Sequence, residues 1–244
     1  MMSLDPSNCA VLACDVFADE LAALTHDKPA WAAIEYLEMG LHDRPDELRA
    51  EVQKAIGRLQ DVAGVQHILL FYGNCGNGLT GVKADRCELV IPRAHDCISI
   101  LLGSPEKHQA ILKENPGTYF YSPGWVRGRR VPGPDREAHL REMYAERYAD
   151  DEEMIEDLIE ADQYSFAHHN CAAYVDITGN KEAEDYCRKC ADSLGWTYKR
   201  LQGDDRVLKE LIDGDWNNGR FLVVKPGQLI AGTADGSLLK AEAY

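Results

Sequence analysis

The sequence predicts an α/β fold with a doubly wound, mostly parallel sheet, and two observations support this prediction. Short apolar runs that are typical of buried strands alternate with longer segments whose apolar residues recur at helical spacing. The connections between successive runs are long enough to hold a helix, and parallel strands need such crossover connections.

Apolar runs and helical periodicity define the elements expected in the N-terminal part of the chain. Strands are expected at residues 8–14, 34–39, 65–72 and 88–91. Helices are expected at residues 15–25, from Pro45 onward, at 96–102 and at 105–115. Pro45 suits the first turn of its helix, where a missing N–H has no helical partner to lose. After it, apolar side chains repeat at helical spacing, at Leu48, Val52, Ile56 and Leu59.

The pattern changes at residues 117–134, where proline and glycine accumulate around a short expected strand, and this segment is a candidate boundary or lid. Alternation then resumes, with helices at 135–162, 182–194 and 206–212 and strands at 172–177, 197–201 and 221–224. We therefore expect an N-terminal α/β lobe of residues 1–116 that carries the Cys/His cluster described below. A C-terminal α/β lobe of residues 117–244 follows, with a cleft between the lobes. A single domain is the alternative, because one large domain can also accommodate 244 residues.

Composition and charge exclude some classes of function. The formal net charge of −15 argues against a nucleic-acid partner, because binding to phosphates needs clustered Lys and Arg. We find no apolar run long enough to cross a bilayer and no export signal, so a soluble, cytoplasmic protein without a membrane partner is expected. Acidic residues concentrate at 137–162, where they form either a solvated helical face or a docking surface for a basic partner.

Five side chains that can bind metals follow expected strands. They are Cys14, His42, Cys75, His95 and Cys97. Because ligands of open α/β sheets gather outside the carboxyl ends of the strands, these side chains are expected to converge at one edge of the sheet. A cytoplasmic location makes metal binding or catalysis more plausible for the thiols than disulfides. The leading hypothesis is therefore a metal or thiolate site.

The turn at residues 72–78 contains Gly73, Gly76 and Gly78 around Cys75. Glycines that directly follow a strand allow a tight turn and a close approach to a ligand, and exposed amides there can bind an anion. The spacing is neither that of a dinucleotide fingerprint nor that of a nucleotide-binding P-loop. We therefore expect the three glycines to bind part of a cofactor, with a tight turn around a packed thiol as the alternative.

Residues 92–97 place several reactive groups just before a helix. Cys97 near the helix N-terminus is expected to have a lowered pKa, because the helix dipole favours the thiolate. Asp96 is expected to cap the helix or to orient His95. Arg93 is expected to bind a carboxylate or phosphate of a small-molecule substrate. Together, Arg93, Asp96 and His95 are the candidate catalytic residues.

The remaining cysteines have simpler interpretations. Cys9, Cys87 and Cys171 are expected in the core. The pair Cys187 and Cys190 lies inside an expected helix without a second pair, so it is interpreted as structural.

Short segments spread over nearly the whole chain form a recognisable combination. They include Ala13-Cys14, Gly40-Leu41-His42, residues 72–78 and Ile91-Pro-Arg-Ala-His-Asp-Cys97-Ile98, with further segments at 102–104, 116–119, 123–125, 203–204, 215–216 and 221–224. This combination resembles the uncharacterised family DUF1638. The resemblance implies an association with corrinoid-dependent methyltransferase systems of anaerobic bacteria and methanogenic archaea, which act on methylated amines and related one-carbon substrates. Asp15 departs from the family pattern, in which a small residue follows Cys14.

The favoured hypothesis is a metalloprotein whose site combines Cys14, Cys75 and Cys97 with His42 or His95. A Cys/His set with an open position suits catalytic zinc, and zinc-bound thiolate is a good methyl acceptor. Three cysteines without a firm fourth ligand suit an iron–sulfur cluster instead. One alternative is a metal-free enzyme with a cysteine nucleophile. Another is a non-enzymatic accessory protein that binds a small ligand or a corrinoid methyltransferase component.

Overall fold

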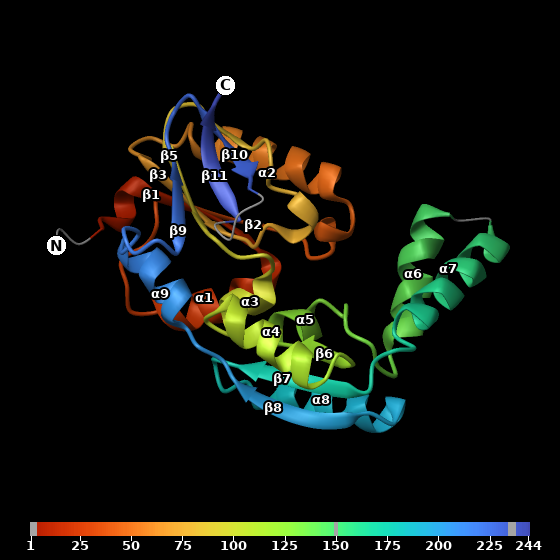
Figure 1. Cartoon of the computed structure of the whole chain (residues 1–244). Helices are drawn as coiled ribbons and strands as arrows, with labels where there is room; N and C mark the ends of the chain where they lie inside the picture. Colours follow the sequence, from red (N-terminus) through yellow and green to blue (C-terminus); the bar gives the residue numbers. More distant parts are fainter. Residues whose placement is uncertain (1–3, 149–150, 234–237) are drawn as a thin grey trace. The chain divides into compact units, whose positions relative to one another are not determined.

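The computed structural model describes residues 4–148, 151–233 and 238–244. The chain forms two compact units: Met1–His108 together with Gly203–Tyr244, and the continuous segment Gln109–Gln202 (Figure 1). The division expected at residue 116 groups 203–244 with the second lobe. The contacts place these residues in the first unit, because β9 (Phe221–Val224) pairs with β5 (Glu88–Pro92). The cleft between lobes stays a prediction.

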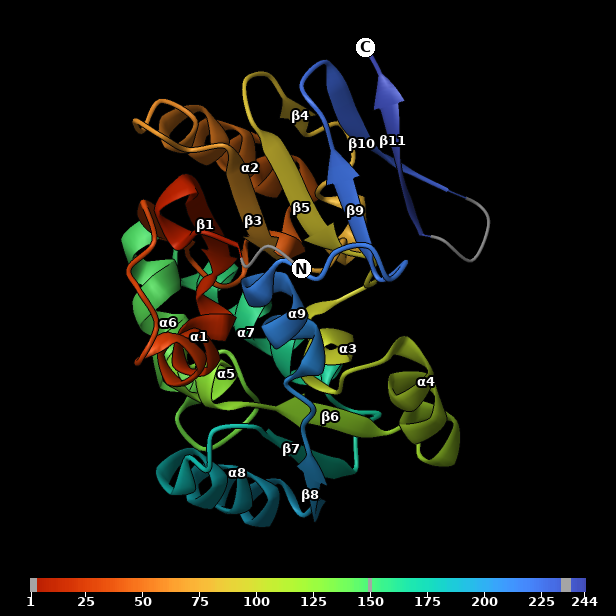
Figure 2. The same ribbon diagram turned by 90° about the vertical axis from the view of Figure 1, so that its left-hand side faces the viewer.

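The first unit is built on a five-stranded sheet in the order β2-β1-β3-β5-β9, of which Figure 2 labels β1, β3, β5 and β9. Its parallel strands are β1 (Cys9–Cys14), β2 (Ala33–Leu37), β3 (His67–Phe71) and β5, and β9 runs antiparallel to β5. All residues of β1 are buried, which explains its continuous apolar sequence. The predicted α/β class with a mostly parallel sheet is confirmed.

Helices of the first unit pack on this sheet through the apolar positions read from the sequence. α2 (Pro45–Leu59) lies against β1 and β2 and buries Leu48, Val52, Ala55, Ile56 and Leu59. α9 (Arg206–Asp213) lies against β3 and β5 and also contacts α3 (Cys97–Leu101). The remaining helices that begin in this part of the chain are α1 (Ala18–Thr25) and α4 (Pro105–Glu114). Among the described residues, no helix is both long enough and apolar enough to span a bilayer.

A second, antiparallel sheet of the first unit has the order β11-β10-β4, which are Leu239–Ala243, Gln228–Gly232 and Lys83–Ala84. Arg93 joins this region to the main sheet. Its Nε donates to the carbonyl of Phe221 at 3.3 Å, and its Nη1 donates to the carbonyl of Leu239. The guanidinium expected to bind a substrate is therefore engaged by backbone carbonyls of β9 and β11.

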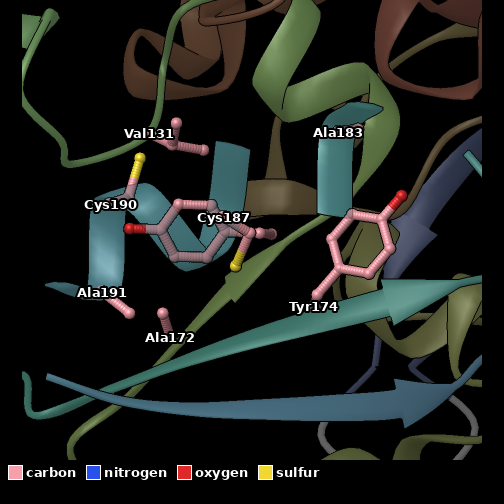
Figure 3. Close-up of a cluster of buried hydrophobic side chains, with 8 residues drawn as sticks. Val131, Ala172, Tyr174, Ala183, Cys187, Cys190 and Ala191 are labelled. Atoms are coloured by element: carbon pink, nitrogen blue, oxygen red, sulfur yellow. The ribbon is translucent and has the colours of Figure 1, made fainter. Parts of the chain in front are cut away.

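The second unit contains a parallel sheet in the order β6-β7-β8, which are Thr118–Tyr121, Cys171–Asp176 and Thr197–Gln202. Its helices are α5 (Pro123–Arg127), α6 (Arg136–Arg147), α7 (Glu152–Ser165) and α8 (Lys181–Leu194). Cys187 and Cys190 point from α8 into a cluster of buried side chains (Figure 3). Burial raises the pKa of Cys190 to about 11, so this pair is part of the core.

The acidic stretch at residues 137–162 falls on α6 and α7, with residues 149–150 outside the described part of the chain. The two helices bury Leu140, Ile155 and Ile159 against each other. Arg136 of α6 also makes a two-pronged ion pair with Asp162 of α7, at 2.6 Å for both contacts. The apolar face of α7 is thus used within the pair, and its acidic residues other than Asp162 are exposed.

The position of Arg93 predicts a structural effect of its replacement. Arg93→Met leaves the carbonyls of Phe221 and Leu239 without this donor, so the free energy of unfolding should fall by about 1–3 kcal/mol. Chemical denaturation measures the difference. Arg86→Met is the matched control, because Arg86 pairs with Asp61 on the surface and such pairs contribute less than about 1 kcal/mol. Equal stability of both variants would contradict this assignment.

Candidate functional site: a pocket of three thiols

Three cysteines meet at the carboxyl edge of the main sheet. Cys14 ends β1, Cys75 lies in the turn after β3, and Cys97 begins the helix after β5. Since β1, β3 and β5 are adjacent parallel strands, their carboxyl ends lie side by side. The Cys97 thiol is hydrogen-bonded to the thiols of Cys14 and Cys75. The structure therefore brings together sulfurs that are far apart in the sequence.

A close backbone contact places Cys75 beside Cys97. Asn74 N–H donates to the carbonyl of Ala94 at 2.9 Å, which holds the turn after β3 against the segment after β5. A Cβ on Gly73 would lie 2.5 Å from the backbone of Asp96, so only glycine fits at this point. The sequence Gly73-Asn74-Cys75 thus delivers its thiol to the start of α3.

The other two glycines of the turn are also explained by packing. Gly76 adopts a positive φ of 55°, and a Cβ there would lie 3.1 Å from the side chain of Pro45. A Cβ on Gly78 would lie 2.6 Å from the Leu48 side chain of α2. These contacts account for Gly73, Gly76 and Gly78 without a bound anion, and binding of a cofactor by the three glycines stays a prediction.

The thiols line a small pocket with a volume of about 10 Å³. A space of this size holds about one water molecule or one ion. Its walls come from the ends of β1, β2 and β3, from the segment before α2 and from α2 and α3. The lining residues are Cys14, Glu38, Gly40, Leu41, His42, Leu48, Tyr72, Cys75 and Cys97.

The three thiols differ in their preference for the charged form. The hydrogen bond from Cys97 lowers the pKa of Cys14, and the backbone N–H of Val16 adds to this effect against the opposing effect of burial. The hydrogen bond from Cys97 likewise lowers the pKa of Cys75, helped by the backbone N–H groups of Cys97 and of Cys75 itself. Cys14 and Cys75 are therefore the two thiols of the pocket whose surroundings favour the thiolate form.

Cys97 has the opposite shift from the one that its helix position predicts. Its hydrogen bonds to Cys14 and Cys75, together with burial, raise the pKa of Cys97 well above its usual value. The expectation of a thiolate at Cys97 is therefore wrong, because its side chain acts as the buried donor. The N–H group at the start of α3 is used by the neighbouring Cys75 sulfur instead.

Tyr72 is a pocket residue that sequence reasoning missed. Its side chain is 3% exposed, and within the described part of the chain its hydroxyl has no hydrogen-bond partner. Burial raises the pKa of Tyr72 well above its usual value, and the charges of Cys14, Cys97 and Cys75 add to this effect. An aromatic residue at the end of a strand is typical of core packing, so the sequence carried no signal for a polar role.

The two candidate histidines differ in their placement. His42 lies in a short 3₁₀ turn, Leu41–Asp43, that follows Gly40, whose φ is 103°. It lines the pocket with a side chain that is 39% exposed, and its Nε2 lies 3.3 Å from Asp43 Oδ1. His95 is exposed and lies outside the set of lining residues. Of the two, His42 is therefore the histidine associated with the thiols.

Asp96 caps α3, as expected. Its Oδ1 accepts hydrogen bonds from the N–H and hydroxyl of Ser99 at 2.7 and 2.9 Å. Its Oδ2 lies 3.3 Å from Nδ1 of His108. Burial acts to raise the pKa of Asp96, but hydrogen bonds from His108 and Ser99 lower it overall. The carboxylate fixes the start of α3, and the imidazole it contacts is that of His108.

The donor chemistry of the pocket suits a thiophilic metal ion, since thiolates are preferred ligands of zinc and iron. In the described part of the chain, however, no three His, Cys, Asp or Glu side chains are already arranged around a point where an ion could be held. The thiols contact one another through hydrogen bonds instead. Binding an ion would require Cys97 to lose its proton and the sulfurs to turn toward the ion.

Comparison with known proteins identifies a family. The family described as "Protein of unknown function (DUF1638)" matches residues 36–212. This range includes His42, Cys75 and Cys97. No curated protein and no solved structure matches the chain.

The contact between Gly73 and Asp96 predicts a large effect of one methyl group. Gly73→Ala must push two backbone segments apart, so the free energy of unfolding should fall by about 2–3 kcal/mol. Gly57→Ala in α2 is the control, because a Cβ there meets nothing within 4 Å and alanine should stabilise the helix by about 1 kcal/mol. Thermal or chemical denaturation of both variants tests this contrast. A harmless Gly73→Ala would contradict it.

The role of Cys97 as donor predicts a change in the pH dependence of Cys75. In metal-free protein, Cys97→Ala removes the hydrogen bond that lowers the pKa of Cys75, so the thiolate forms only at higher pH. The midpoint of the pH–rate profile for alkylation of Cys75 by iodoacetamide should therefore rise, and the rate near neutral pH should fall. Cys97→Ser keeps a donor and should shift the midpoint less. Quantitative mass spectrometry of the labelled peptide measures the rates, and an unchanged midpoint in Cys97→Ala would refute the donor role.

Proposed function

Because the chain belongs to the DUF1638 family, whose function is not established, we propose a function from its own site: a metalloprotein in which Cys14, Cys75 and Cys97 hold one metal ion. The observation that carries this proposal is the meeting of three thiols from three adjacent strand ends. Two of them have lowered pKa values, and the thiolate is the form that binds metals.

The size of the pocket favours a single ion over a cluster. A volume of about 10 Å³ accommodates one atom, whereas an iron–sulfur cluster would have to displace the pocket walls. Leu41 and Leu48 are buried walls of this pocket, and Leu48 also packs against the Gly78 turn. Among the candidate cofactors we therefore place zinc first and an iron–sulfur cluster second.

The residues around the thiols would have distinct roles. Cys14 and Cys75 supply negative charge, and Cys97 would give up its proton when the ion binds. His42 at the pocket mouth is the histidine that could join them or control access. Asp96 fixes the start of α3 and thereby the position of Cys97. A bound zinc ion would supply Lewis acidity for the activation of a thiol or water.

The family resemblance adds a metabolic context to this proposal. It suggests a cytoplasmic enzyme of anaerobic one-carbon or methylated-amine metabolism, with a small-molecule substrate and a corrinoid methyltransferase component as its partner. A zinc-bound thiolate would suit that setting, because it is a good methyl acceptor.

A metal-free cysteine nucleophile is the second candidate, and one observation favours it. Cys75 is the only free cysteine in the described residues that is partly exposed, and its pKa is lowered. It would attack an electrophilic substrate, with His42 as the base. An accessory protein without turnover is a third candidate, with the acidic surface of α6 and α7 available to a basic partner.

Metal analysis of the purified protein tests the proposal. We expect stoichiometric zinc in colourless protein prepared without oxygen and without a metal-binding tag. Each of the variants Cys14→Ala, Cys75→Ala and Cys97→Ala should lose the metal. Cys87→Ala should keep it, because burial raises the pKa of Cys87 to about 11 and this thiol lies outside the pocket.

Other outcomes of the same experiment separate the candidates. Stoichiometric iron with brown charge-transfer absorption would identify the cofactor as an iron–sulfur cluster and not as zinc. Absence of both metals from folded protein would refute the metal proposal. Loss of reactivity in Cys75→Ala alone would then support the nucleophile.

A further inference from the structure

We infer that the protein leaves one position of the ion open and that Tyr72 donates a hydrogen bond to the small ligand that fills it. This inference rests on the proposed function, because it concerns the fourth position of the same three-thiol site. With three protein ligands and one open position, the ion could bind a small ligand. A purely structural zinc site, by contrast, has four protein ligands.

The first observation is the unsatisfied hydroxyl of Tyr72. It is buried in the pocket wall and has no hydrogen-bond partner among the residues that the structure describes. Leaving a buried polar group unpaired costs about 1–3 kcal/mol, and folded proteins rarely do so. A group that the fold itself leaves unpaired is therefore expected to find its partner in a bound molecule.

The second observation is that Tyr72 lines the same pocket as the three thiols. Tyr72 shares the pocket with the thiols of Cys14, Cys75 and Cys97, whose charges act on its phenol group. A phenol is protonated at neutral pH, so the Tyr72 hydroxyl serves as a donor. A ligand that binds here must therefore carry a lone pair to accept its hydrogen bond.

The third observation is the placement of His42. Its imidazole is 39% exposed and lies near Asp43, so it stands at the mouth of the pocket, whereas Tyr72 is buried. The pocket has a volume of only about 10 Å³, so beside an ion held among the three sulfurs it leaves room for a small ligand only. The class of ligand that fits is therefore a small molecule or anion with an accepting lone pair, such as water, a thiolate or azide. Glu38 also lines the pocket and should weaken the binding of anions in general.

Spectroscopy of the cobalt(II)-substituted full-length protein tests the inference, with azide as the probe. Wild-type protein should show thiolate-to-cobalt charge transfer, and azide should change the cobalt ligand-field bands. Tyr72→Phe should keep the charge-transfer intensity and the cobalt stoichiometry but bind azide roughly fivefold to tenfold more weakly, as expected for one lost hydrogen bond. Tyr36→Phe is the matched control, because Tyr36 lies on β2 outside the pocket, and it should bind azide like wild type. His42→Ala should keep the thiolate-to-cobalt charge transfer and the cobalt stoichiometry, because the inference leaves His42 outside the set of ligands.

The stability of metal-free protein provides a second readout. If the Tyr72 hydroxyl lacks a partner in the protein, Tyr72→Phe should leave the metal-free form as stable as wild type or more stable. A clear loss of stability would show that the hydroxyl is already paired, and this would overturn the inference.

The remaining outcomes distinguish failure of the inference from failure of the proposed function. Ligand-field bands that do not respond to azide, equal azide affinity in Tyr72→Phe and wild type, or loss of the site in His42→Ala would overturn the open position while the thiolate metal site stands. Absence of thiolate charge transfer from folded wild-type protein would overturn the metal site itself, and the inference with it.

Discussion

The close approach of two backbone segments, Gly73 after β3 and Asp96 before α3, is the constraint on which the site depends. No side chain fits between them, so the two connections that follow neighbouring strands are held in one position. This contact sets Cys75 beside Cys97, while the carboxylate of Asp96 fixes the first turn of α3. The same turn packs against α2 through Gly78 and Leu48, so the position of the thiols is linked to the packing of the main sheet.

The charge distribution of the pocket follows from where its hydrogen-bond donors lie. Backbone N–H groups of Val16, Cys75 and Cys97 point at the sulfurs of Cys14 and Cys75, and the Cys97 thiol adds a donor between them. The most buried sulfur is therefore the one that keeps its proton. A cation in this place would substitute for that proton and would neutralise the two thiolates more fully than a shared hydrogen bond does.

Much of the fold and part of the site could be predicted from the sequence, because both depend on local patterns. Buried apolar runs predicted β1, β3 and β5, and their shared direction explains why Cys14, Cys75 and Cys97 meet. The Asp96 cap was predictable from its place before a helix. The family was also correctly identified, since its motifs are local in the sequence.

What the sequence did not predict depends on contacts between distant segments. The small sheet of β4, β10 and β11 was missed because β4 and β10 pair across most of the chain. The role of Arg93 could not be foreseen, since its acceptors lie on β9 and β11. The pKa shift of Cys97 was wrong in direction, because the neighbouring thiols outweigh its position in the helix. Tyr72 was missed because nothing in a sequence shows that a hydroxyl lacks a partner.

The insertion of Gln109–Gln202 within the first unit has a consequence for biosynthesis. On the ribosome, β1, β2, β3 and β5 emerge early, but the strand that covers the free edge of β5 is β9, which emerges only after the whole inserted unit. An uncovered strand edge can pair with other chains. The inserted unit is continuous in sequence, so it can fold while the first unit waits for its last strand. The nascent chain therefore carries an exposed strand edge for the time needed to translate more than a hundred residues.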